Sequence, residues 1–143
     1  MSVLLDTHAL LWYIGQRPMA NDALVSIARA QAENQLHVSL ISAWEIGIAT
    51  LKQTKERRPD LQDLAPDSWF RDAIRSLGAI AIPIQLEVAL EAARVPLIYG
   101  SGDPGDCFLI ATARVNNLAL ITRDKNIHQL ARQRADYIRV IGC

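Results

Sequence analysis

The sequence predicts a single α/β domain with a short parallel sheet of about five strands and helices on both faces. Short, uniformly apolar segments alternate along the chain with longer segments of helical periodicity. The apolar segments lack the alternation of polar and apolar residues that marks a strand with one face in water. The length of 143 residues is close to the usual size of one domain, so one unit is expected over residues 1–143.

The strands are predicted from apolar runs that end at polar or turn-forming residues. The run at residues 3–5 enters Asp6 and turns directly into a helix. The other strands are expected at residues 36–38, 79–84, 118–122 and 137–141.

The helices are predicted from apolar residues spaced three and four apart and from residues that start or stop helices. Asn21 or Asp22 is expected to cap the second helix, and Ser39 or Ser42 to open the third. Two further segments are rich in polar residues, proline or glycine and are expected to be loops or, in the first case, a fraying helix: residues 53–66 and 96–105. The helices are expected at residues 8–14, 21–33, 39–51, 67–77, 86–95, 106–117 and 126–134.

Composition excludes several classes of protein. Fifteen Lys and Arg residues balance fifteen Asp and Glu residues, so the chain is no polybasic nucleic-acid-binding arm, and any nucleic acid must be attracted by local basic patches. Two cysteines are too few for a disulfide framework or a zinc site. The absence of a charged leader and of a long apolar stretch predicts a cytoplasmic protein without a membrane segment.

Five carboxylates are expected at one edge of the sheet. Asp6 and Asp124 each follow a predicted strand, and Glu45 lies in the first turns of the helix after the second strand. Asp103 and Asp106 open the helix that leads to the fourth strand. Ligands of open α/β sheets bind beyond the carboxyl ends of the strands, which is where these side chains are predicted to meet.

Each acid also has a purely structural interpretation. Asp6, Asp103 and Asp124 are suited to cap helices, and Ser42 with Glu45 fits a capping box. Capping is the better interpretation for any one of them taken alone. However, Asp6 is the only formal charge in residues 1–16, and Glu45 is the only one in residues 35–51.

Carboxylates embedded in apolar sequence need a cation, a hydrogen-bond network or a raised pKa. Several acids at one edge repel one another unless a cation neutralises them, and Mg²⁺ prefers oxygen ligands. Such a site can polarise a phosphate and deprotonate water. We therefore favour a metal site over a chance meeting of helix caps.

Four segments of the chain, in order and over nearly its whole length, resemble the motifs of PIN domains of the VapC type, which occur in toxin–antitoxin pairs. The first contains Leu5-Asp6-Thr7-His8, and the last is Leu120-Ile121-Thr122-Arg123-Asp124. No single segment is specific, whereas the four in order are. They cover residues 5–12, 38–46, 102–113 and 120–124.

The resemblance implies a metal-dependent endoribonuclease that uses Mg²⁺ or Mn²⁺. The catalytic and metal-binding acids of that family fall on Asp6, Glu45, Asp106 and Asp124, and Asp103 matches an auxiliary acid at the edge of the site. The implied substrate is RNA, commonly tRNA or rRNA. The implied partners are a VapB-like antitoxin, whose tail enters the acidic pocket, and a second copy of the chain in a homodimer.

The third motif departs from the pattern of relatives, which often carry basic and aromatic residues in this segment. Here the corresponding positions hold Gly102, Gly105 and Cys107. The departure affects substrate contacts and inhibition by an antitoxin more than it affects metal binding, because the four acids are present.

Other side chains are weaker candidates. Thr7 and Thr122 adjoin the acids and are auxiliary candidates that could hydrogen-bond a carboxylate or a metal-bound water, or could simply be capping hydroxyls. The three tryptophans, Trp12, Trp44 and Trp69, lie on apolar helical faces and are expected in the core or a dimer interface. One basic run could hold an RNA backbone or could be a solvated loop, and its members are Lys52, Lys55, Arg57 and Arg58.

Two other classes remain as alternatives. A Mg²⁺-dependent phosphatase-type domain would also place an acid after its first strand, but the haloacid-dehalogenase pattern needs a second Asp at position 8, which is His8. Within the same class, a phosphotransferase of the receiver-domain kind needs an acid at the end of its third strand, and residues 79–84 end without one. A non-catalytic module with the same fold would have no reason to keep mutually repelling acids.

Overall fold

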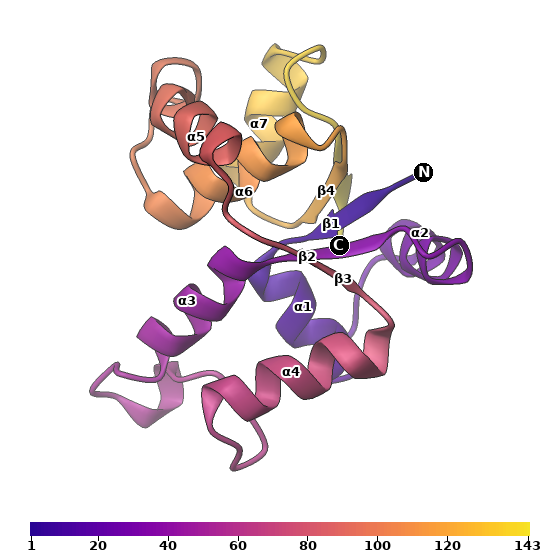
Figure 1. Ribbon diagram of the computed structural model, residues 1–143, viewed down its shortest axis with the longest axis vertical. Coiled ribbons are helices and arrows are strands. Elements are labelled where there is room, and N and C mark those ends of the chain that lie inside the picture. Colours follow the sequence, from indigo (N-terminus) through magenta and orange to yellow (C-terminus); the bar gives the residue numbers. More distant parts are fainter.

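The computed structural model describes residues 1–143 and shows one parallel sheet of five strands with helices on both faces (Figure 1). The strand order is β3-β2-β1-β4-β5, and every pair of neighbours is parallel. The predicted fold class is therefore confirmed. The strands are β1 (Val3–Leu5), β2 (Leu36–Ser39), β3 (Ile80–Ile82), β4 (Ala119–Thr122) and β5 (Val140–Gly142).

Seven α-helices alternate with or follow these strands, and none is long and apolar enough to cross a membrane. A short 3₁₀ turn, Lys55–Arg57, lies in the segment between α3 and α4. The helices are α1 (Thr7–Ile14), α2 (Asn21–Ala32), α3 (Leu40–Ala49), α4 (Pro66–Leu77), α5 (Leu86–Tyr99), α6 (Pro104–Val115) and α7 (Lys125–Gln133).

The apolar core is divided in two by the sheet. Successive side chains of a strand point to opposite faces, so Val3 and Leu5 pack with α1, α2 and α4, whereas Leu4 packs with α5, α6 and α7. Figure 1 shows the second group of helices above the strands and α1 and α4 below them. The central strands β1 and β4 are buried along their whole length, which explains why they are almost uniformly apolar, whereas the edge strands β3 and β5 are partly exposed.

The strand order places a switch point between β1 and β4. The chain runs outward from β1 to β2 and β3, then returns to the other side of β1 to form β4 and β5. Leu5 lies beside Ile121 in the register of β1 and β4, so these two strands end together. A crevice forms at such a point because the flanking connections diverge to opposite faces of the sheet.

Three segments differ from the prediction: β3 and β5 are shorter than the strands expected at residues 79–84 and 137–141, and α5 is longer than expected. Residues 96–99 were expected in a loop, but α5 continues through Pro96 to Tyr99, and α6 begins at Pro104. A proline removes one helical hydrogen bond, yet the buried side chains of Ala92 and Val95 hold α5 in the core on this face of the sheet. The helix ends at Gly100, whose φ of 79° is left-handed.

The structure also decides between the alternative caps predicted for two helices, α2 and α3. α2 starts after Ala20 with no side-chain cap, so neither Asn21 nor Asp22 caps it. α3 is capped by Ser39, whose Oγ accepts a hydrogen bond from the N–H of Ile41 at 3.1 Å. Ser42 is fully buried within α3, so its pair with Glu45 is not a capping box.

Candidate active site

Asp6 lies where β1 turns into α1 without an intervening loop. Its N–H donates to the carbonyl of Ile121 in β4 at 3.0 Å, and its Oδ1 accepts from the N–H of Ala9 at 2.6 Å. The residue caps α1 and is only 6% exposed. Burial raises the pKa of Asp6, whereas hydrogen bonds from Thr122 and Ala9 act in the opposite direction.

Asp124 has the corresponding position after β4. Its Oδ1 accepts from the N–H groups of Asn126 and Ile127 at 2.9 and 3.0 Å and so caps α7. Thr122 Oγ1 in turn accepts from the N–H of Asp124 at 3.0 Å. The cap uses one carboxylate oxygen, and the other has no hydrogen-bond partner in the chain. An acid can therefore cap a helix and still offer an oxygen to a ligand.

Asp103 and Asp106 lie at the start of α6. Asp103 Oδ1 accepts from the N–H of Asp106 at 3.0 Å and caps the helix. Asp106 Oδ2 accepts from the hydroxyl of Tyr99 at 2.9 Å. Burial raises the pKa of Asp106 to about 6; the Tyr99 hydrogen bond lowers it, and the nearby carboxylates, with Asp103 first, raise it further.

Glu45 reaches the other acids from α3. Thr7 Oγ1 donates to Glu45 Oε1, and Ser42 Oγ lies 2.9 Å from the same Thr7 oxygen. Burial raises the pKa of Glu45, and the Thr7 hydrogen bond lowers it. A Cβ on Gly105 would collide with Glu45 Oε2, so the carboxylate occupies space that any larger residue at position 105 would fill.

All five predicted acids line one cavity of about 460 Å³. It lies at the switch point, because Asp6 and Asp124 follow the adjacent strands β1 and β4. Only one Lys or Arg side chain, Arg123, is part of the lining. The complete lining is Asp6, Thr7, His8, Trp12, Glu45, Asp103, Asp106, Leu109, Arg123 and Asp124.

The remaining predicted residues lie elsewhere. Thr122 is fully buried and does not line the cavity; it hydrogen-bonds Asp6, and its Oγ1 accepts from the N–H of Asp124. The basic run is exposed in the turn after α3 and does not line the cavity. Within it, the Arg58 Nε donates to the carbonyl of Lys52 at 2.6 Å. The run consists of Lys52, Lys55, Arg57 and Arg58.

Three residues at the site, Tyr99, Trp12 and Gly105, are outside the set of predicted site residues. Tyr99 belongs to a segment that the sequence predicts as a loop, and its hydrogen bond to Asp106 depends on the extra turn of α5. Trp12 was expected in the core or a dimer interface, but its ring is partly exposed in the cavity wall under the guanidinium of Arg123. Only Gly105 left a signal, because it replaces a larger residue in the motif.

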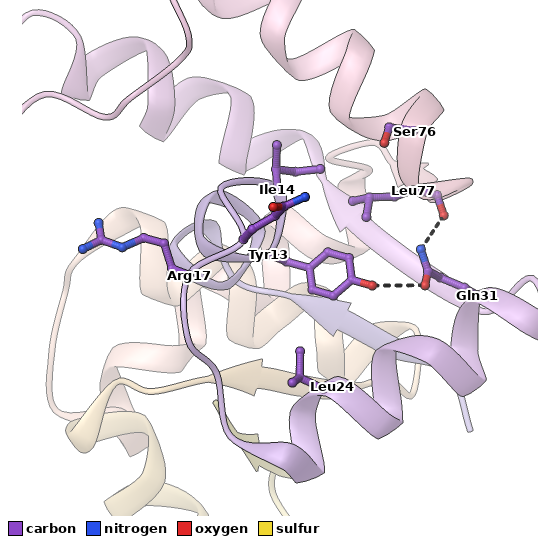
Figure 2. Close-up of a pocket in the computed structure, with 8 residues that line it drawn as sticks. Tyr13, Ile14, Arg17, Leu24, Gln31, Ser76 and Leu77 are labelled. Atoms are coloured by element: carbon purple, nitrogen blue, oxygen red, sulfur yellow. Dashed lines mark hydrogen bonds between the residues drawn. The ribbon is translucent and has the colours of Figure 1, made fainter.

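A second cavity, of about 550 Å³, lies between α1, α2 and α4 (Figure 2). Two of its polar side chains are joined by hydrogen bonds: the Tyr13 hydroxyl donates to Gln31 Oε1 at 3.4 Å, and Gln31 Nε2 donates to the carbonyl of Leu77 at 3.2 Å. No carboxylate lines it. The acidic cavity at the switch point is therefore the better candidate for chemistry.

The donor set of the acidic cavity fits a hard divalent cation. Five carboxylates face one basic side chain and one imidazole, and burial with mutual repulsion raises the pKa of Asp6, Glu45 and Asp106. In the conformation described, no three His, Cys, Asp or Glu side chains are close enough together to hold an ion. Binding would thus require carboxylates to turn toward a common point.

The fold and the cavity define an α/β protein with an acidic site at the switch point of a parallel sheet. A family model described as the PIN domain matches residues 3–133. The chain belongs to the PIN domain family. A search of curated protein sequences gives no match.

Solved structures similar to this chain come from toxin–antitoxin systems. A chain of VapBC2 from Rickettsia felis, bound to a DNA fragment from the promoter, has a TM-score of 0.68 and 14% identity, over 100% of this chain and 99% of that one. A chain of DNA-bound VapBC from Salmonella typhimurium has a TM-score of 0.67 and 15% identity, over 99% of this chain and 98% of that one. A chain of FitAcB from Neisseria gonorrhoeae has a TM-score of 0.61 and 19% identity, over 97% of this chain and 96% of that one. At these identities the likeness establishes the fold.

Proposed function

We propose that the chain is a metal-dependent endoribonuclease toxin of the VapC kind that a VapB-like antitoxin neutralises. The observation that carries the proposal is the convergence of five carboxylates in one cavity at the switch point of the sheet. They come from α3 and from the starts of α1, α6 and α7. Membership of the PIN family supports nuclease chemistry for such a cavity.

In this proposal Asp6, Glu45, Asp106 and Asp124 hold one or two Mg²⁺ or Mn²⁺ ions, and Asp103 is an auxiliary acid at the edge. When bound, the metal supplies a Lewis acid that polarises the phosphodiester and makes a water nucleophile available at neutral pH. The expected products are a 5′-phosphate and a 3′-hydroxyl.

The other side chains keep the acids oriented and ionised. Thr7 fixes the carboxylate of Glu45, and Tyr99 fixes that of Asp106. Both hydrogen bonds lower the pKa of their carboxyl group, as the bond from Thr122 does for Asp6. The ionised carboxylate is the form that binds a metal, so these neighbours favour binding near neutral pH.

The proposed substrate is an RNA of the tRNA or rRNA class, which a cytoplasmic protein would meet. A protein partner is supported by the similar solved structures, which are complexes of VapBC and FitAcB. A homodimer is supported by an exposed apolar stripe on α3, one residue in each turn. Its members are Leu40, Trp44 and Ile48, with Leu51 just beyond the helix.

The proposed function is tested by incubating the purified chain, free of any antitoxin, with total RNA in Mg²⁺, Mn²⁺ or EDTA. Asp6→Asn removes a ligand while an oxygen remains to cap α1, so the variant should fold and cleave at least about a hundredfold more slowly. Asp67→Asn, at an exposed position of α4, makes the same change of charge outside the cavity and should cleave as the wild type does.

Discrete fragments that require the metal and disappear in Asp6→Asn would support the proposal. Equal cleavage by Asp6→Asn and the wild type would contradict the assignment of Asp6. Metal binding without cleavage of RNA, combined with hydrolysis of a phosphomonoester, would favour the phosphatase alternative. If the chain neither binds metal nor cleaves RNA, a non-catalytic module would be favoured.

A further inference from the structure

The acidic cavity has an unusual basic side chain at its rim. An RNA backbone carries a negative charge on every nucleotide, and five carboxylates repel it unless a cationic group offsets them. Arg123 is the only Lys or Arg in the lining, and it lies between Thr122 and Asp124 in the last motif.

Arg123 does not neutralise the neighbouring acids. It forms no ion pair, although Asp124 is the next residue. Its guanidinium instead lies over the Trp12 ring, with Cζ 3.4 Å from the ring centroid, and its Nε donates to the carbonyl of Cys143 at 3.1 Å. The aromatic stack and the hydrogen bond hold the guanidinium in place.

The two terminal nitrogens of Arg123 remain free. Apart from its contact with the Cys143 thiol, the only hydrogen bond of the Arg123 side chain is the one from Nε to the carbonyl of Cys143, and the residue is exposed. The terminal N–H groups of a guanidinium form a planar fork that matches two oxygens of a phosphate. A fixed guanidinium with a free fork loses little conformational freedom when it binds an anion.

A second arginine contacts the same indole. The Cζ of Arg17 lies 5.7 Å from the centroid of the Trp12 ring, and Arg17 also has no ion-pair partner. Figure 2 shows its side chain extending away from the hydrogen-bonded Tyr13 and Gln31.

We propose that Arg123, supported by Trp12 and joined by Arg17, binds a backbone phosphate of the RNA next to the bond that is cut. The inference rests on the proposed function and names the residues that hold its substrate. Trp12 acts as a platform for Arg123 and not for a base, because the guanidinium already covers its ring. The site would take over the substrate contact that the third motif lacks at Gly102 and Cys107.

The test measures binding of a fluorescein-labelled single-stranded RNA of about 20 nucleotides by anisotropy, in Mg²⁺ and at several salt concentrations. Asp6→Asn is the non-cleaving parent. Adding Arg123→Gln should raise Kd about tenfold and reduce the slope of log Kd against log salt by about one. Adding Trp12→Leu should raise Kd to a smaller extent, and Arg123→Lys should keep the salt slope but lose part of the affinity because the fork is absent.

The matched control is Arg71→Gln, an exposed arginine of α4 with no ion pair and no side-chain hydrogen bond, which should leave Kd unchanged. The proposal would be overturned if Arg123→Gln had the same Kd and the same salt slope as its parent. It would also be overturned if Arg71→Gln lost as much RNA affinity as Arg123→Gln, or if the parent did not bind RNA. The proposal would also be overturned if Arg123→Gln lost binding to a polyglutamate peptide but kept RNA binding, because that result would assign the rim to a protein partner.

Two further measurements separate this proposal from the proposed function. Mn²⁺ affinity, measured by calorimetry on the wild-type background, should not fall in Arg123→Gln, because removing a positive charge beside the acids does not weaken their attraction for a cation. Cleavage of RNA by the wild type combined with unchanged RNA binding in Arg123→Gln would overturn the rim contact alone. Loss of binding in Arg123→Gln without any cleavage by the wild type would support the rim contact and contradict the nuclease.

Discussion

Three acids of the cavity are helix caps as well as candidate ligands. Asp6, Asp103 and Asp124 each use Oδ1 to cap a helix, so capping and ligand binding are compatible for the same side chain. The sequence raised these as competing interpretations. The structure shows the caps and also brings the three acids into one cavity with Glu45 and Asp106.

Sequence reasoning found the acids because charges in apolar segments stand out. Hydrogen-bond and stacking partners are harder to predict, since they depend on where helices end and how side chains turn. The stack of Arg123 on Trp12 joins residues that lie far apart in the chain, and neither has an unusual sequence context. Such contacts follow from the packing of α1 beside β4, which no local pattern encodes.

Gly105 is predicted to determine where Glu45 lies. In Gly105→Ala the new Cβ would displace the Glu45 carboxylate from Thr7, and a displacement of this kind slows an enzyme by about ten- to a hundredfold. Single-turnover cleavage of RNA measures the effect. Adding Glu45→Asp shortens the side chain, so Gly105→Ala should be less harmful on that background than on the wild type.

Gly102→Ala is the matched control for this prediction, because a Cβ there would meet nothing within 4 Å. It should cleave at the wild-type rate. If Gly105→Ala cleaves as fast as Gly102→Ala, the close approach of Glu45 to position 105 has no effect on the reaction.

At the scale of elements, α5 shows where a local rule fails. Proline predicts the end of a helix, and the predicted end at residue 95 follows that rule. The buried face of α5 outweighs the lost hydrogen bond, and the helix gains the residues that end in Tyr99. The extra turn brings the Tyr99 hydroxyl to Asp106, so tertiary packing sets a contact of the site.

Tyr99→Phe is predicted to change the pH dependence of metal binding. The lost hydrogen bond favoured the ionised carboxylate, so the pKa of Asp106 should rise above its value of about 6. Protons then compete with the metal up to a higher pH. Calorimetric titration with Mn²⁺ over a series of pH values should show the half-maximal affinity displaced to higher pH.

Tyr137→Phe provides the control, because the hydroxyl of Tyr137 has no hydrogen-bond partner and does not line the acidic cavity. The control should reproduce the wild-type pH profile. Identical profiles for Tyr99→Phe and Tyr137→Phe would show that Tyr99 does not influence the ionisation of Asp106.

At the scale of the whole molecule, we predict that the cavity makes the stability of the fold depend on pH and on added metal. The pKa of Asp106 is raised from 3.8 to about 6 in the folded chain, so the folded state holds this proton more tightly than the unfolded state. In EDTA its contribution is therefore greatest below about pH 4 and is lost as the pH rises to about 6. Asp106→Asn should remove this contribution to the pH dependence of the free energy of unfolding.

Added Mn²⁺ should reverse the trend, because it binds the ionised acids of the folded chain only. At a concentration of about 100 times Kd it would stabilise the fold by about 2.7 kcal/mol, and melting temperatures across the pH range measure both effects. Melting temperatures that do not respond to Mn²⁺ at any pH would contradict a metal site in the cavity.

The direction of the helices that begin at the acids gives the cavity a charge of its own. The N-termini of α1, α6 and α7 all start at Asp6, Asp103 and Asp124, so their peptide dipoles have their positive ends at this one place. Each is equivalent to about half a positive charge near a helix end, and together they offset part of the repulsion among the carboxylates. Neither a chelator nor a change of pH removes this contribution, because it belongs to the backbone. The folded chain can therefore hold its acids together before any cation arrives.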